Sequence, residues 1–267
     1  MSDILEEIVA RKRLDVAQAK ERLPEQQLHC LVERQLEAES HSPAPRRSMQ
    51  QALLQSSTGI IAEFKRRSPS KGWIKEEGRP DIIPPAYEQA GASALSILTD
   101  EPYFGGSQSF IQTARPLVHI PILRKDFIID EYQLFEARHI GADAVLLIAA
   151  CLTLQQCATF VHTAHQLGLE VLLETHSEAE LDYATLEADM VGVNNRNLGT
   201  FVTDVQNSFR MAELLPADRV LVSESGIASP DTIGQLRQAG YRGFLIGETF
   251  MRQADPGAAL QAFVQAL

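Results

Sequence analysis

The stretch IPILRKDF at residues 120–127 contains a short apolar run that ends in polar side chains, and this pattern indicates the fold. Runs of this kind recur along the chain after residue 58. Eight can be counted: GIIAEFK (59–65), ALSILTD (94–100), IPILRKDF (120–127), DAVLLIAAC (143–151), EVLLETH (170–176), DMVGVNNRN (189–197), RVLVSESGI (219–227) and GFLIGETFM (243–251). Such runs are typical of parallel strands buried on both faces.

Segments with helical character separate these runs. They include residues 131–142, 153–168, 177–188 and 229–240. Ser177 and Ser229 open the last two segments with acidic residues soon after them, which is typical of helix N-caps. Strands and helices therefore alternate from residue 59 to the end of the chain.

Eight strand–helix units predict an α/β protein with a (β/α)8 TIM barrel. The alternative is a doubly wound open sheet. That alternative is disfavoured because no GxGxxG sequence follows the first run, and because the eight runs equal the number of strands in a closed barrel.

The first 58 residues do not show this alternation of strands and helices, and their pattern is mostly helical. Apolar residues at Ile4, Ile8, Val9 and Val16 lie among charges and predict an amphipathic helix over residues 3–22. A second, shorter helix is expected around residues 28–36, a loop over residues 39–48, and a further helix from residue 49. We expect an N-terminal helical extension, residues 1–58, packed on a barrel of residues 59–267, with one domain overall.

Composition excludes several classes of protein. The 267 residues are 45% apolar and 22% charged, as in ordinary soluble proteins, and the formal net charge is −11. This acidic balance argues against general binding to nucleic acids or to anionic membranes. No apolar stretch approaches the length of a membrane span, and the three cysteines form no CxxC pair. We expect a cytoplasmic protein, with a monomer as the starting expectation.

Polar residues end most of the expected strands. In a barrel the carboxyl ends of all strands meet at one mouth, so these side chains should converge there. A single charge at a strand end is often only a solvated cap, but convergence makes that interpretation weaker for the group. The residues are Glu63, Lys65, Asp100, Lys125, Asp126, Glu174, Asn194, Arg196, Glu224, Ser225, Gly247 and Glu248.

Two pairs within this group suggest acid–base chemistry. Lys125 and Glu174 belong to the third and fifth strands, and alternate strands contribute to one layer of a barrel, so these side chains can face each other. A lysine opposite a glutamate can donate and abstract protons. Glu63 and Lys65 are two residues apart and share one strand face with Ile61. They form either part of the catalytic group or a structural ion pair.

Two glycine-bearing segments predict a phosphate site. SESGIASP (223–230) and FLIGETFM (244–251) place glycines at the ends of the last two strands, where barrel enzymes often bind phosphate through backbone N–H groups. RRSPSKG (66–72) adds hydroxyls and three cations after the first strand and is expected to be a mobile substrate clamp. The alternatives are plain tight turns and a solvated loop.

Other chemistry finds less support. His162 and His165 lie three residues apart on an expected helix without a further ligand, which favours a surface pair over a metal site. Neither a GxSxG nucleophile motif nor a P-loop is present.

Several motifs together resemble one known family. They are ILEEIVARKRLDV (4–16), IIAEFKRRSPSKG (60–72), ILRKDFIIDEYQ (122–133), LLETH (172–176), VGVNNRNL (191–198), SESGI (223–227) and LIGETFM (245–251). In this order they resemble the indole-3-glycerol-phosphate synthases of tryptophan biosynthesis. SESGI alone is shared with other phosphate-binding barrels, but AEFKRRSPSKG together with RKDFIID is highly specific.

The resemblance implies a lyase reaction that needs no metal and no organic cofactor. The substrate is 1-(2-carboxyphenylamino)-1-deoxyribulose 5-phosphate, a small anionic molecule with a carboxylate and a phosphate. An aromatic carbon attacks the ribulosyl carbonyl, and CO2 and water then leave to give indole-3-glycerol phosphate. Charges such as Lys65, Lys125 and Arg196 would make the cleft locally positive despite the acidic chain.

The resemblance also implies residue roles. Lys125 would be the general acid at the carbonyl, Glu174 its acid/base partner, and Glu63 an aid to proton transfer. Lys65 would pair with the substrate carboxylate, while Asn194 and Arg196 hold the reacting groups. The residues implied around the phosphate are Ser68, Ser225, Gly226, Gly247 and Glu248. Glu224 would contact the substrate, and Phe127 would line the pocket for the aromatic ring. The side chain of Glu248 would have to point away from a bound dianion.

The resemblance further places the N-terminal extension over the catalytic mouth, beside the 66–72 loop. Two other functions stay open at this point. One is an aldolase that forms a Schiff base on Lys125, and the other is a non-catalytic barrel that binds sugar phosphates.

Overall fold

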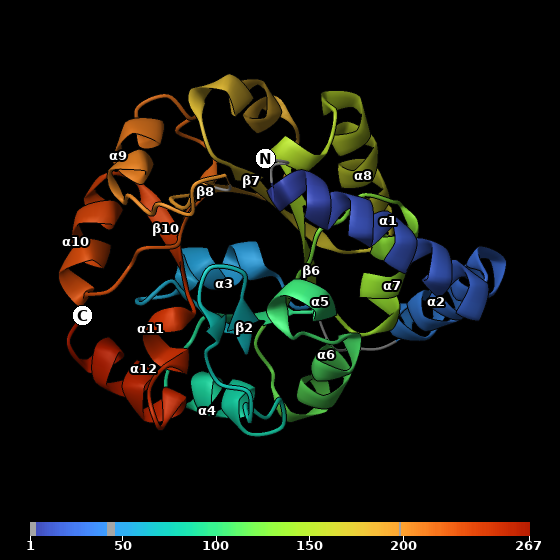
Figure 1. The fold of residues 1–267 in the computed structure, drawn as a ribbon, viewed down its shortest axis with the longest axis horizontal. Coiled ribbons are helices and arrows are strands. Elements are labelled where there is room, and N and C mark those ends of the chain that lie inside the picture. The colour runs from blue at the N-terminus through green and yellow to red at the C-terminus, as the bar shows by residue number, and fades with distance from the viewer. Residues whose placement is uncertain (1–3, 42–45, 198) are drawn as a thin grey trace.

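A computed structural model describes residues 4–41, 46–197 and 199–267. Eight parallel strands close into a barrel in the order β1-β10-β9-β8-β7-β6-β5-β4, and helices surround it (Figure 1). The strands are β1 Ile60–Phe64, β4 Ala94–Leu98, β5 Ile122–Lys125, β6 Ala144–Ile148, β7 Glu170–Thr175, β8 Met190–Asn194, β9 Val220–Glu224 and β10 Tyr241–Ile246. The closed sheet confirms the expected TIM barrel and excludes the open doubly wound sheet.

Helices follow the strands around the barrel. They are α4 Ile83–Gln89, α5 Glu101–Phe104, α6 Gln108–Ala114, α7 Tyr132–His139, α8 Leu154–Gln166, α9 Gln206–Ala212, α10 Pro230–Gln238, α11 Glu248–Met251 and α12 Pro256–Gln265, with 3-10 segments η1 Arg115–Leu117, η2 Ala149–Cys151 and η3 Glu178–Thr185. Ser229 caps α10 by accepting a hydrogen bond from the Thr232 N–H. The expected α-helix after Ser177 is wrong, because η3 is a 3-10 helix and the Ser177 side chain makes no cap hydrogen bond.

The loop after β1, which was expected to be a mobile substrate clamp, contains regular secondary structure. It forms a short antiparallel hairpin of β2 Arg67–Ser68 and β3 Gly72–Trp73. The Arg66 guanidinium lies 5.3 Å from the centroid of the Trp73 ring. Stacking of a cation on an aromatic ring stabilises such a hairpin, and this contact could not be read from local sequence pattern.

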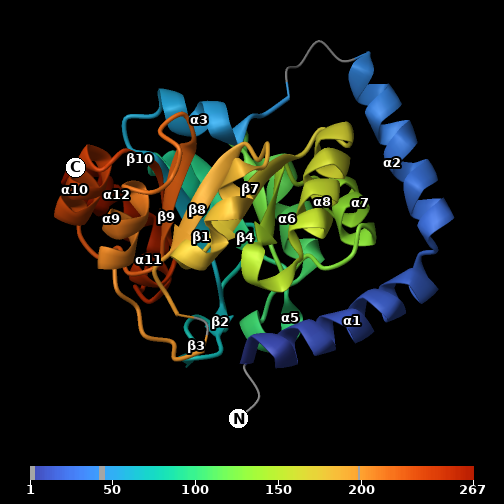
Figure 2. The same cartoon turned by 90° about the horizontal axis from the view of Figure 1, so that it is seen from above.

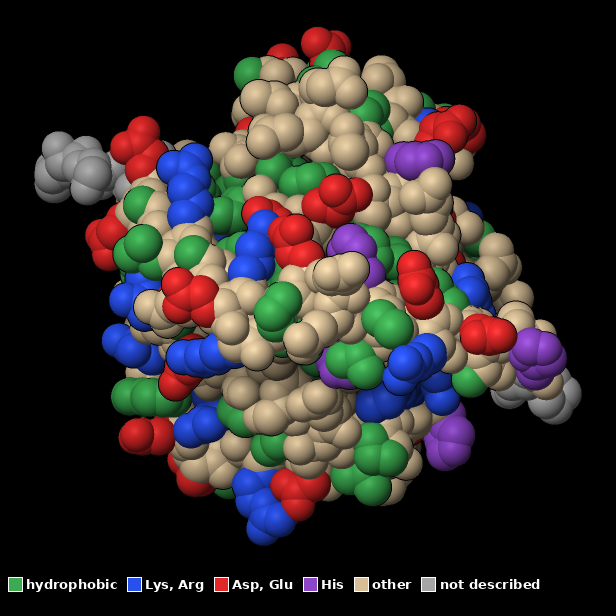
Figure 3. All heavy atoms as spheres, turned by 90° about the vertical axis from the view of Figure 1, so that its right-hand side faces the viewer, with side chains coloured by type: hydrophobic (Ala, Val, Ile, Leu, Met, Phe, Trp, Pro, Cys, Tyr) green, Lys and Arg blue, Asp and Glu red, His purple; other side chains and the backbone are tan. Residues whose placement is uncertain are grey.

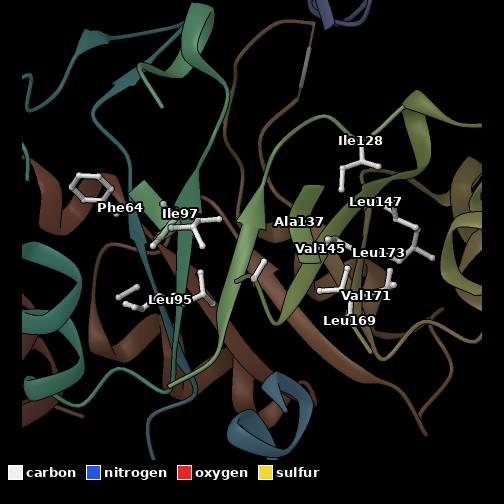
Figure 4. Packing of buried hydrophobic residues seen from close by; sticks show 14 of the residues in the cluster. Phe64, Leu95, Ile97, Ile128, Ala137, Val145, Leu147, Leu169, Val171 and Leu173 are labelled. Carbon is white, nitrogen blue, oxygen red and sulfur yellow. The ribbon is translucent and has the colours of Figure 1, made fainter. Parts of the chain in front are cut away.

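Alternation along the strands divides the core into two clusters. One lies between the barrel wall and the surrounding helices and contains Phe64, Ile97 and Leu173 (Figure 4). The other fills the barrel interior and contains Ile61 and Leu172. Because side chains alternate across a strand, Glu63 shares the inward face with Ile61, as predicted.

In the described part of the chain before the barrel there are three helices: α1 Ile4–Arg22, α2 Glu25–Ser40 and α3 Met49–Gln55. The second is longer than expected, and part of the predicted loop, residues 42–45, lies outside the described residues. Figure 2 shows α1 at the same end of the barrel as the β2–β3 hairpin, and α3 at the opposite end. The chain before β1 therefore reaches from one end of the barrel to the other.

The outer helix α2 packs on α7, where the rings of His29 and Phe135 stack with centroids 3.8 Å apart. On this side of the molecule acidic and basic side chains are interspersed with apolar ones (Figure 3). No helix in the described ranges is long and apolar enough to cross a membrane.

The short helix α3 closes the barrel at the amino ends of its strands. Met49 and Leu53 are buried and belong to the interior cluster. The Ser48 side chain accepts a hydrogen bond from the Gln51 N–H at 3.0 Å, and the Gln50 N–H donates to Glu170 at the start of β7 at 2.9 Å. These contacts hold α3 across the amino-terminal end of the barrel, where its apolar side chains are part of the barrel core.

Candidate active site

A cavity of about 380 Å³ opens at the carboxyl ends of the strands; it is called the mouth cavity below. Every residue that the sequence assigned to catalysis or substrate binding lines it. Ile4, Leu5 and Ile8 of α1 line it as well. The first helix of the extension therefore lies at the mouth, as the resemblance implied, whereas α3 lies at the opposite end of the barrel.

Four charged side chains form one layer inside the mouth. Glu63, Lys125, Glu174 and Glu224 come from β1, β5, β7 and β9, the first, third, fifth and seventh strands of the barrel. Alternate strands contribute to a layer in this fold, so the strand parity brings these groups together. The layer holds one cation and three carboxylates.

Lys125 is the centre of this layer. Its Nζ donates hydrogen bonds to Glu174 Oε2 at 2.8 Å and to Glu224 Oε2 at 2.7 Å. The predicted approach of Lys125 to Glu174 is therefore observed. Glu224 was expected among the substrate-binding residues, and in the structure it bonds directly to Lys125.

The two glutamates differ in their surroundings, so their protonation differs. Burial favours the neutral form of both, but Lys125 and His176 outweigh burial at Glu174 and lower the pKa of that carboxyl below its usual range. At Glu224 burial prevails, assisted by the nearby Glu174 charge, and raises the pKa of Glu224 to about 7. The site thus holds one firm anion and one carboxyl that titrates near neutrality.

The charge on Lys125 is firmly held. Burial disfavours the ammonium, but the carboxylates of Glu174 and Glu224 outweigh it and raise the pKa of Lys125 above its ordinary value. Lys125 is consequently protonated at neutral pH.

His176 was not among the residues expected from sequence. Its Nε2 lies 3.1 Å from Glu174 Oε1, and its Nδ1 lies 3.6 Å from Glu180 Oε2. Burial opposes the imidazolium, yet these carboxylates raise the pKa of His176 to about 10. The sequence spacing could have indicated this contact, because His176 follows Glu174 by two residues and so lies on the same side of the strand end.

Glu63 and Lys65 pair with each other, with Lys65 Nζ 2.5 Å from Glu63 Oε1. Gly247 makes room for this pair. A Cβ on Gly247 would collide with Glu63 Oε1 and lie 3.0 Å from the Glu63 Cβ. The glycine is therefore required by a side chain of the mouth layer, in addition to the expected approach of a phosphate.

The loops after the last two strands also line the cavity. Ser225 and Gly226 both adopt positive φ angles, 69° and 77°. This conformation is strained for serine, and such strain clusters at binding sites. The hydroxyl of Ser68 is buried and has no hydrogen-bond partner among the described residues, so it is free to contact a ligand.

Cations from separate loops gather around Glu248. Its carboxylate lies 3.3 Å from Lys71 Nζ and 3.8 Å from Arg196 Nη2, and it also pairs with Arg252. Arg196 in turn donates a hydrogen bond to Ser70 Oγ at 2.9 Å. Glu248 is one of the residues that line the cavity, and three cations surround its carboxylate.

Apolar side chains form the remaining wall. The rings of Phe104 and Phe127 lie with centroids 6.0 Å apart, and Phe127 belongs to the interior cluster with Ile8 and Ile148. Asn194 accepts a hydrogen bond from the Arg196 N–H at 3.0 Å through Oδ1. The mouth cavity therefore has an apolar wall opposite its charged layer.

The histidines of α8 lie outside this site. His165 Nε2 is 2.9 Å from Asp189 Oδ2, and His162 contacts Gln166. Within the described ranges no group of three or more His, Cys, Asp or Glu side chains could hold a metal ion.

Fold and site together define a TIM-barrel enzyme with a lysine–carboxylate group at the mouth and glycine-bearing loops beside it. The model of the indole-3-glycerol phosphate synthase family matches residues 5–263. This chain belongs to that family.

Curated relatives agree with this assignment over their full length. The indole-3-glycerol phosphate synthase of Bacteroides thetaiotaomicron is 60% identical over 267 residues and covers 100% of both chains. That of Azoarcus sp. is 45% identical and covers 98% of this chain and 99% of its own.

Among solved structures, 3-hexulose-6-phosphate synthase from Salmonella typhimurium matches with a TM-score of 0.61 at 14% identity, covering 78% of this chain and 98% of its own. Thiamine phosphate pyrophosphorylase from Pyrococcus furiosus gives a TM-score of 0.60 at 16% identity, covering 80% and 96%. These two likenesses concern the fold alone.

Proposed function

We propose that Lys125 and the carboxylates around it catalyse the reaction of this family. The activity is a lyase reaction of tryptophan biosynthesis that closes a ring in 1-(2-carboxyphenylamino)-1-deoxyribulose 5-phosphate with loss of CO2 and water. The observation that carries the assignment of residues is the position of the Lys125 ammonium between Glu174 and Glu224 in the mouth cavity.

Lys125 acts as the general acid. Attack of the aromatic carbon places negative charge on the carbonyl oxygen, and a proton donor within hydrogen-bond distance lowers that barrier. The surrounding carboxylates keep Lys125 protonated before substrate binds. A Schiff-base aldolase needs a neutral amine, so the same observation favours the synthase over that alternative.

Glu174 and Glu224 have different roles, one in charge stabilisation and the other in proton transfer. The intermediate formed by ring attack carries positive charge near nitrogen, which a firm anion such as Glu174 stabilises. Glu224 titrates near neutrality, so it can accept and return a proton when CO2 and water leave. Glu63, which pairs with Lys65 in the unliganded site, assists proton transfer beside them.

The two anionic groups of the substrate bind to separate groups of residues in the mouth cavity. Lys65 exchanges Glu63 for the substrate carboxylate, and Phe127 packs on the aromatic ring. The phosphate lies at the loops of Ser225, Gly226 and Gly247, where Ser68 and Arg196 reach it. Asn194 and Glu248 order Arg196 through the contacts described above.

The direct test is appearance of indole-type fluorescence from the carboxyphenylamino substrate, with a chelator present and no added metal. We expect turnover by the wild-type chain and loss of it in Lys125→Ala. Substrate trapped on Lys125 by borohydride would instead support the aldolase, and binding without turnover would support a binding module.

We further infer that the enzyme works as a cytoplasmic monomer without nucleic acid, and that residues 1–58 and 59–267 act as extension and barrel of one domain. The acidic net charge supports the inference that the enzyme does not bind nucleic acid. Size-exclusion chromatography with light scattering tests the monomer, and a dimer mass would contradict it.

A further inference from the structure

Lys12 is a charged residue on the buried face of α1, the helix that lies at the mouth cavity. The buried residues of this helix are Ile8, Lys12 and Val16, which recur every four positions and therefore share one face. Lys12 is only 5% exposed. A buried ammonium is costly unless it is paired, so this position demands partners.

The partners come from two strand ends of the barrel. Lys12 Nζ lies 2.7 Å from Asp100 Oδ2 and 2.8 Å from Asp126 Oδ1. Asp100 also caps α5 by accepting a hydrogen bond from the Tyr103 N–H at 2.9 Å. Asp126 follows Lys125 directly in the chain.

The barrel holds Asp126 from its other side as well. Thr99 Oγ1 donates a hydrogen bond to Asp126 Oδ2 at 2.6 Å, and Arg124 Nη2 donates to the same atom at 3.0 Å. Arg124, itself buried, also reaches Glu136 on α7 at 3.2 Å. Lys12 therefore joins α1 to a network that is already fixed in the barrel wall.

Such a network has a geometric consequence that apolar packing alone would not have. Apolar residues can slide along an apolar surface, whereas an ammonium between two fixed carboxylates has one favourable position. A buried ion network contributes little net stability compared with well-packed apolar residues. Its main effect here is to fix the position of α1 along the barrel surface.

We propose that Lys12 is a positioning residue for the reaction, one that fixes α1 so that Ile4 and Ile8 form the cavity wall for the aromatic end of the substrate. Ile8 lies one turn before Lys12 and Ile4 one turn before that, and both line the mouth cavity. This inference rests on the proposed function, because that function supplies the aromatic group.

The test compares Lys12→Met with wild type in steady-state kinetics. The substitution keeps an unbranched side chain but removes the charge. We expect KM to rise about tenfold or more, since small misplacements of a binding wall have effects of this size. kcat should change less, because Asp126 keeps its bonds to Thr99 and Arg124. Inhibition by inorganic phosphate, which binds at the loops after β9 and β10, should be unchanged.

Lys20→Met is the matched control. Lys20 lies on the same helix and is also paired, with Nζ 2.9 Å from Asp130 Oδ2, but its side chain is 32% exposed and it lies about three helical turns after Ile8. We expect its KM to equal that of wild type. Lys12→Arg, which keeps the charge, should recover part of the loss.

Amide hydrogen exchange gives a second measurement that does not depend on turnover. We expect faster exchange in α1 of Lys12→Met and unchanged exchange in the barrel strands. Failure of the wild-type chain to turn over substrate would contradict the proposed function, whereas unchanged exchange in α1 would overturn the positioning role itself.

Two kinetic outcomes would also overturn the proposal: a wild-type KM in Lys12→Met, or an equal loss of substrate and phosphate affinity, which would indicate general loosening. If Lys12→Met does not fold, Asp100→Asn provides the test, because it removes one of the two carboxylates that pair with Lys12 and leaves Asp126 in place. A raised KM with unchanged phosphate inhibition supports the proposal, and an unchanged KM refutes it.

Discussion

Gly192 lies directly against Glu224 inside the barrel. A Cβ on Gly192 would collide with Glu224 Oε1 and lie 3.3 Å from Leu172 Cδ1. Glycine in a strand interior weakens the strand, so its presence in β8 needs a reason. The reason is that Gly192 leaves space for the Glu224 carboxylate, which contacts Lys125. A glycine in the apolar strand β8 thus determines where a carboxylate of the charged layer lies.

Gly192→Ala should therefore impair catalysis by displacing Glu224. We expect kcat/KM to fall by about ten- to a hundredfold, the effect of misplacing a catalytic group, while the protein remains folded. Circular dichroism and kinetics check both points.

Gly234→Ala serves as the control, because Gly234 lies in α10 and nothing stands within 4 Å of its added Cβ. It should retain activity and gain roughly 1 kcal/mol of stability from higher helix propensity. Wild-type activity in Gly192→Ala would show that Glu224 does not need its observed position.

Lys125→Ala should lower kcat by about 10²–10⁴-fold, the usual contribution of a general acid. Lys125→Arg should fail as well, because arginine keeps the charge but releases its proton poorly. Single-turnover kinetics with saturating enzyme separates this loss from weaker binding. Retention of activity within about threefold in either variant would refute the assignment.

The barrel and its charged layer could be predicted because both depend on local periodicity. Strand runs fix the alternation of side chains, and alternation together with strand order brings Lys125 to Glu174. The same rule extends to Glu224 and to His176, although His176 was not singled out from sequence. Strand-end residues of one face are thus the part of the site that sequence determines well.

Contacts between distant segments could not be predicted in this way. Lys12 looks like any charge on an amphipathic helix, since its partners Asp100 and Asp126 lie far along the chain and their position depends on where α1 packs.

The pairing of His176 predicts a pH-dependent stability. Its pKa is raised from 6.5 to about 10, so the contribution of the imidazolium to stability is fully present below pH 6.5 and is lost as the pH rises through 10. The stability difference between wild type and His176→Asn should therefore shrink over this range. Urea unfolding at a series of pH values measures it.

His162→Asn is the control for that series, because His162 lies exposed on α8. It should change the free energy of unfolding by no more than about 0.5 kcal/mol. A difference for His176→Asn that stays constant from pH 6 to pH 10 would contradict the imidazolium pairing with Glu174.

Inorganic phosphate should compete with substrate, raising KM and leaving kcat unchanged, because it binds at the loops after β9 and β10. Gly247→Val should weaken this inhibition and also lower kcat, since the new side chain collides with Glu63. Isothermal titration with phosphate gives the affinity directly. A KM that does not respond to high phosphate would place the anion site elsewhere.

Deletion of residues 1–45 tests the catalytic role of the first two helices. The truncated chain keeps α3, whose Met49 and Leu53 close the far end of the barrel, so the interior core remains complete. It loses Ile4 and Ile8 from the mouth cavity and exposes Asp100 and Asp126 to water, where they are readily solvated. A cover over the mouth excludes water and helps to order the loops around substrate.

We therefore expect the truncated chain to stay soluble with a cooperative melt, to bind inorganic phosphate as wild type does, and to bind substrate much more weakly. The opposing outcome is aggregation, because removal of α2 uncovers the ring of Phe135 on α7. Adding Phe135→Gln to the truncation separates the two effects, since it removes the exposed ring without touching the mouth. A doubly altered chain that still aggregates would assign α1 and α2 to folding, and one that keeps wild-type kcat/KM would show that neither helix serves catalysis.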